Sequence, residues 1–144
     1  MITSRATSSV IEEWLQSIKI WCPSICPAYF MSDNDGAQLR AINCVYPESK
    51  ILLCWWHILK DWKKKLHGVE PKNEQDNLWQ QLKLLLMTSK IFEEDIKIVQ
   101  QLANPEFNLY FERTWLPKKE LWAFAFRQDR SILQSSNTNM LIER

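Results

Sequence analysis

FMSDNDGAQLRAI, residues 30–42, joins a short apolar run to a helical pattern through a cluster of polar residues. Asp33 and Asp35 lie in that connection, just before a helix that is expected to begin near Gly36. An aspartate in this position can cap the helix by accepting hydrogen bonds from its first N–H groups. A carboxylate at the C-terminal end of a strand can instead bind Mg²⁺ or Mn²⁺. The local sequence leaves both roles open.

Strands and helices alternate on both sides of this stretch. Apolar residues at helical spacing predict helices over residues 10–21, 36–46 and 57–67. Short apolar runs predict strands over residues 28–32 and 50–56. We expect a capping box of Ser9 and Glu12 to open the first helix, and Trp55 and Trp56 to be core residues. The alternation favours an α/β layer with neighbouring parallel strands.

The second half of the chain carries helical patterns without strands between them. These patterns cover residues 74–87, 90–102, 106–114 and 118–128, with Pro105 and Pro117 between the later segments. The chain has only 2 Gly, which argues against a loop-rich all-β fold, and its 46% hydrophobic residues and 8 Trp argue against disorder. We therefore expect a mostly helical protein in which a helical block follows an α/β start.

The charge distribution gives one local candidate for a nucleic-acid surface. The formal net charge is +1, so the whole chain has no strong attraction for nucleic acid. Four lysines cluster on the helix predicted over residues 57–67: Lys60, Lys63, Lys64 and Lys65. A solvated helix face is the more frequent explanation of such a cluster. No apolar run reaches the ~20 residues of a membrane span, and we expect a soluble intracellular protein.

Cys54 and His57 form a C-x-x-H pair at the end of the second predicted strand. With Cys22 and Cys26 they offer four ligands of the types that zinc prefers. C-x3-C is not the preferred spacing of zinc fingers, and the two pairs belong to unrelated elements. A buried cysteine and a histidine at the edge of a site are therefore the favoured interpretation, and zinc is not expected. Glu143, in the terminal SSNTNMLIER, would by itself be an ordinary exposed helix carboxylate.

Taken together, these segments resemble a known family. The sequence contains, in this order, S-D-x-D-x-A-Q-L-R-A-I, C-x-W-H with basic residues after it, a helical block that includes WLPKKELWAFAFR, and T-N-x-x-x-E. This order is similar to that of the Mutator-like element (MULE) transposases. The resemblance runs from about Pro27 to the end of the chain. It implies an RNase H-like core in which three acidic residues bind Mg²⁺ or Mn²⁺. It also implies an enzyme that cuts and joins transposon-end DNA in the nucleus.

The resemblance also assigns roles to individual residues. Asp33 matches the second acidic residue and Glu143 the third, so both would be catalytic and would bind metal. Cys54 and His57 match a signature that supports the site, and Asp35 is a less suitable catalytic candidate. The basic helix residues Lys60, Lys63, Lys64 and Lys65 would contact DNA phosphates.

One departure from the family limits the expected activity. The family's first Asp lies on an earlier strand, whereas no Asp precedes Asp33 in this sequence. We therefore expect a fragment of a transposase that is inactive alone, with the divisions 1–9 (flexible tail), 10–67 (partial RNase H-like unit), 68–136 (helical insertion) and 137–144 (start of the helix carrying the last acidic residue). A small open sheet would favour homo-oligomers. The alternative is a non-enzymatic, helix-rich DNA- or protein-binding remnant.

Overall fold

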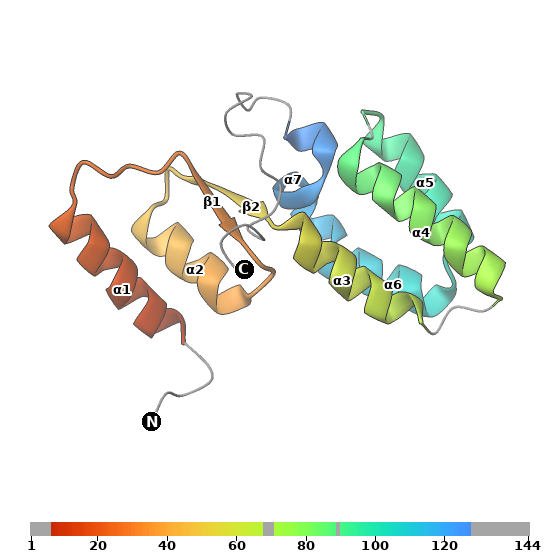
Figure 1. Ribbon diagram of the computed structural model, residues 1–144, viewed down its shortest axis with the longest axis horizontal. Coiled ribbons are helices and arrows are strands. Elements are labelled where there is room, and N and C mark those ends of the chain that lie inside the picture. The colour runs from red at the N-terminus through yellow and green to blue at the C-terminus, as the bar shows by residue number, and fades with distance from the viewer. Residues whose placement is uncertain (1–6, 68–70, 89, 128–144) are drawn as a thin grey trace. The chain divides into compact units, whose positions relative to one another are not determined.

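The computed structural model describes residues 7–67, 71–88 and 90–127. The chain divides between Cys54 and Trp55 into two compact units, and each is described by itself. The first unit contains a small sheet and two helices, and the described part of the second unit is helical (Figure 1). The fold is therefore mostly helical with a small parallel sheet, as the sequence predicts.

The first unit consists of α1 (Ser8–Trp21), β1 (Tyr29–Ser32), α2 (Gly36–Val45) and β2 (Lys50–Leu53). The two strands pair in parallel, from Tyr29 opposite Lys50 to Ser32 opposite Leu53. This confirms the predicted parallel neighbours, and the first strand ends at Ser32 as predicted but begins one residue later than predicted. The second predicted strand, residues 50–56, was too long because the chain enters a helix at Trp55.

Helices α1 and α2 pack against each other within the first unit. Lys19 of α1 donates a 2.7 Å hydrogen bond to the Val45 carbonyl at the end of α2, where a cation offsets the negative end of the helix dipole. The predicted capping box was wrong. Helix α1 begins at Ser8 after Thr7, whose side chain makes no capping bond, and the Ser8 hydroxyl donates to the Glu12 carboxylate at 2.7 Å.

The described part of the second unit begins with a long helix and ends with three short helical segments. Its elements are α3 (Trp55–Leu66), α4 (Lys72–Met87), α5 (Phe92–Leu102), α6 (Pro105–Thr114), η1 (Leu116–Lys118), α7 (Lys119–Trp122) and η2 (Phe124–Phe126). The helices predicted from residue 57 to residue 114 are thus present with small shifts of their ends. The helix predicted over residues 118–128 is interrupted within its described part, which reaches residue 127, because Ala123 adopts an extended conformation after α7.

Aromatic side chains form the centre of the second unit. Trp62 is fully buried, and its ring meets those of Trp115 and Trp122 edge to face, with centroids 5.8 and 5.5 Å apart. Trp55 is buried and donates its indole N–H to the Trp122 carbonyl at 2.8 Å. Trp56, predicted to be a core residue, is instead 38% exposed, because α3 turns it away from the side of the helix that Trp55 and Trp62 occupy.

Candidate functional site

The C-terminal ends of β1 and β2 meet at one edge of the sheet. The Cys54 N–H donates a 2.8 Å hydrogen bond to the Ser32 carbonyl, which continues the strand pairing by one residue. Asp33 therefore leaves β1 at the same edge at which Cys54 leaves β2. In parallel sheets this edge is where ligands and catalytic groups gather.

Asp35 is the N-cap of α2. Its Oδ1 accepts hydrogen bonds from the N–H groups of Ala37 and Gln38, each at 2.9 Å. These bonds satisfy two of the four amides that a helix leaves unpaired at its start. The choice between capping and metal binding is thereby resolved for this residue. Capping explains why an aspartate stands directly before Gly36.

Asp33 does not cap the helix. Its Oδ1 is buried, and in the part of the chain that the structure describes it has no hydrogen-bond partner. The neighbouring Ser32 hydroxyl is engaged elsewhere, because it donates to Oε1 of Gln38 at 2.7 Å. A carboxylate oxygen shielded from water without a hydrogen bond is unfavourable unless a cation or another donor compensates it. The donor chemistry of Asp33 therefore fits a hard divalent cation.

Glu143, the other predicted metal ligand, lies outside the described residues, as does the whole T-N-x-x-x-E motif. Within residues 7–67, 71–88 and 90–127, no group of three or more His, Cys, Asp or Glu side chains is placed to hold a metal ion. The pairing of Asp33 with Glu143 therefore stays a prediction. Asp33 is the predicted metal ligand whose surroundings the structure defines.

The C-x-x-H pair is divided between the two units. Cys54 is the last residue of the first unit and its side chain is fully buried. His57 belongs to α3 in the second unit, where its ring meets the edge of Trp56 with centroids 4.7 Å apart. Its Nδ1 is buried and has no hydrogen-bond partner among the described residues. A supporting role for this pair stays a prediction.

The predicted DNA-binding lysines are all exposed on α3. With 3.6 residues per turn, Lys60, Lys63 and Lys64 lie on one face and Lys65 lies on another. The Lys60 ammonium is 4.8 Å from the centre of the Trp56 ring, and Lys65 is over the Tyr110 ring at 5.2 Å. Three lysines in the last turn also stabilise the negative end of the helix dipole. The face of Lys60, Lys63 and Lys64 is therefore the part of this cluster that can contact an extended anion.

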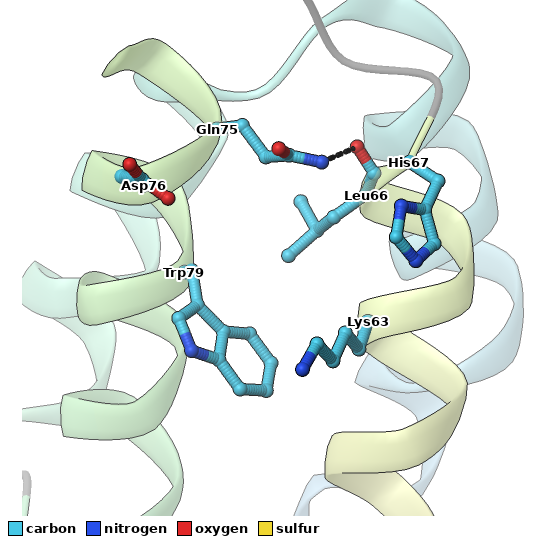
Figure 2. A pocket seen from close by; sticks show the side chains of 6 residues that line it. All are labelled: Lys63, Leu66, His67, Gln75, Asp76 and Trp79. Carbon is cyan, nitrogen blue, oxygen red and sulfur yellow. Dashed lines mark hydrogen bonds between the residues drawn. The ribbon is translucent and has the colours of Figure 1, made fainter. Parts of the chain in front are cut away.

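Sequence reasoning missed a pocket between α3 and α4. Figure 2 shows its lining residues, which are Lys63, Leu66, His67, Gln75, Asp76 and Trp79. They come from α3, from the turn that follows it and from α4, which the sequence alone does not bring together. The polar residues around Trp79 were the available signal, but helical spacing does not distinguish the wall of a pocket from the core.

Comparison of the sequence with protein-family models, and of the chain with curated proteins and solved structures, gives no match. Among the residues that the structure describes, no helix is both long and apolar enough to cross a membrane. The features that bear on function are therefore the sheet edge at Asp33, the lysine face of α3 and the order of the sequence motifs.

Proposed function

We propose that this chain derives from the catalytic region of a MULE-type DDE transposase with an RNase H-like core, and that Asp33 binds Mg²⁺ or Mn²⁺. The observation that carries the proposal is the buried Asp33 Oδ1, which has no hydrogen-bond partner in the described ranges, at the C-terminal end of a parallel strand. Asp35 supplies an internal comparison, because its carboxylate is two residues away and is occupied by the cap.

Metal-dependent strand cleavage fits this arrangement chemically. A divalent ion held by carboxylates lowers the pKa of a bound water and stabilises the charge that develops on a phosphodiester. In the proposal, Asp33 provides one ligand and Glu143 another, and transposon-end DNA in the nucleus is the substrate. In the proposal, the family's first acidic residue has no counterpart among residues 1–32, which contain no Asp. We expect this 144-residue chain to bind metal weakly and not to cut DNA by itself.

A second candidate is a non-enzymatic DNA-binding module. It is favoured by the exposed face of Lys60, Lys63 and Lys64 on α3, which requires no metal to attract phosphates. Binding to duplex DNA in the presence of EDTA, without Mn²⁺ binding at Asp33, would support this function over the first.

The test is a titration with Mn²⁺, followed by electron paramagnetic resonance of the free ion, of the unmodified chain and of two variants. Asp33→Asn should abolish the tightest Mn²⁺ binding, because an amide oxygen has no charge to offer the cation. Asp35→Asn is the matched control and should leave Mn²⁺ binding unchanged, because this carboxylate caps α2. Equal binding by the unmodified chain and the Asp33→Asn variant would rule out a metal role for Asp33.

A further inference from the structure

The pocket between α3 and α4 lies entirely within the second unit and has a volume of about 90 Å³. Lys63, His67 and Asp76 are exposed residues, so the pocket is open to solvent along its rim. It can accept one edge of a planar ring while the remainder of a ligand stays outside.

One hydrogen bond ties the two walls of the pocket together. The side-chain amide of Gln75, in the first turn of α4, donates to the Leu66 carbonyl at the end of α3 (Figure 2). Leu66 itself is 2% exposed, so its side chain is anchored in the core. The bond links the end of one wall to the start of the other. The pocket is therefore formed before any ligand arrives, which lowers the cost of binding.

Trp79 gives the pocket an aromatic wall. It is half-buried, and Figure 2 shows the Lys63 side chain reaching from α3 toward its indole. Lys83, one turn further along α4, places its ammonium 5.7 Å from the centre of the same ring. An indole with cations nearby offers a stacking surface for a planar base and positive charge for an anion attached to it.

The polar groups of the pocket are available to a ligand. Within the described ranges, Lys63, His67 and Asp76 make no hydrogen bond or ion pair. The neighbouring Lys64, in contrast, is 4.0 Å from Asp61. Lys63 can donate to a phosphate, and the Asp76 carboxylate, which only accepts, can bind the N–H groups of a base.

We propose that this pocket binds a single unpaired nucleotide, with its base against Trp79 and its phosphate at Lys63. A base has the flat π-surface that Trp79 requires and N–H groups for Asp76, and the phosphate supplies the anion. The nucleotide can be free or part of a single strand, whereas duplex DNA keeps its base faces stacked and inaccessible. The proposal does not depend on metal binding at Asp33.

The test is a calorimetric titration with dGMP and with deoxyguanosine, in EDTA so that no metal at Asp33 contributes. The unmodified chain should bind dGMP more tightly than deoxyguanosine. Trp79→Ala should weaken dGMP binding by about 5- to 150-fold, the range for loss of one base–aromatic stack. Lys63→Met should reduce the affinity for dGMP to that for deoxyguanosine. Lys97→Met removes an exposed lysine of α5 that does not line the pocket, and should bind dGMP normally.

Absence of dGMP binding at millimolar concentration, or equal binding by the Lys63→Met and Lys97→Met variants, would overturn the proposal. The exposed position of Lys63 keeps this comparison valid even if Trp79→Ala does not fold. If a short single-stranded oligonucleotide displaces dGMP, the ligand of the pocket is an unpaired nucleotide within a strand. If the oligonucleotide does not displace dGMP, the ligand is a free nucleotide. If duplex DNA displaces dGMP from both the unmodified chain and the Trp79→Ala variant, this result would contradict binding through a stacked base.

Discussion

The carbonyl of Ser32 accepts a 2.8 Å hydrogen bond from the N–H of Cys54. This bond aligns the ends of β1 and β2, so Asp33 and Cys54 enter the same edge of the sheet. The position of Asp33 is consequently fixed by backbone pairing and not by bonds of its own side chain to other described residues. Substitutions at Asp33 should therefore change its chemistry without moving the strand.

The first prediction concerns the different roles of Asp33 and Asp35. Asp35→Ala should lower the free energy of unfolding by about 1 kcal/mol, the usual cost of losing an N-cap. Asp33→Asn should have no cost or should stabilise the fold, because it removes a charge from a buried oxygen that lacks a partner among the described residues. Urea unfolding of both variants gives the comparison. A larger loss at Asp33 than at Asp35 would show that the Asp33 carboxylate has a structural partner.

The second prediction concerns the tryptophans. Trp62→Ala should destabilise the second unit by about 3–5 kcal/mol, because it empties the centre of a fully buried aromatic cluster. Trp14→Ala is the matched control: Trp14 is 64% exposed on α1, and its removal should change stability by about 0.5 kcal/mol or less. Thermal unfolding followed by circular dichroism measures both. Similar losses for the two variants would mean that the surface of α1 is covered in solution.

The third prediction is a pH dependence due to Tyr110. Burial raises the pKa of Tyr110 above 10.0, and the negative charge of Asp61 adds to this rise. The folded state therefore keeps the phenol proton at pH values where the unfolded chain has lost it. The resulting stability is fully present below the unfolded pKa and is lost as the pH rises through the folded pKa.

Urea unfolding between about pH 8 and pH 11 measures this effect, since it covers the ordinary pKa of tyrosine. Tyr110→Phe should flatten the fall in stability at alkaline pH relative to the unmodified chain. An unchanged alkaline slope in this variant would place the responsible proton on another group.

The fourth prediction separates the lysines of α3. If Lys60, Lys63 and Lys64 contact phosphates, replacing all three with methionine should make the plot of log affinity for duplex DNA against log salt concentration less steep. The change in slope should be that expected for the loss of about three phosphate contacts. Lys65→Met should change it little, because Lys65 lies on another face over the Tyr110 ring. Binding measured by fluorescence anisotropy at several salt concentrations provides the slopes. A change in Lys65→Met one third as large as that in the triple variant would indicate a non-specific effect of charge, because one charge is removed instead of three.

The regular elements could be predicted from sequence because their apolar residues repeat with clear periods. The limits of β1 and α2 follow from YFMS and from the turn before Gly36. The end of β2 was not predictable from hydrophobicity, since Trp55 continues an apolar run while its indole bonds to Trp122, 67 residues away. The same applies to the α3–α4 pocket, which depends on the packing of two helices. At the candidate site, local sequence could not decide which aspartate capped α2, because either lies close enough to its first turn.

The pairing of β1 with β2 also bears on how the first unit folds. Tyr29 is opposite Lys50, 21 positions later in the chain, and α2 occupies most of the interval. Closing so short a loop costs little chain entropy, and the helix within it can form on the microsecond scale. We therefore expect the register of this sheet to be set by residues 29–54 themselves, without contributions from the chain beyond Cys54.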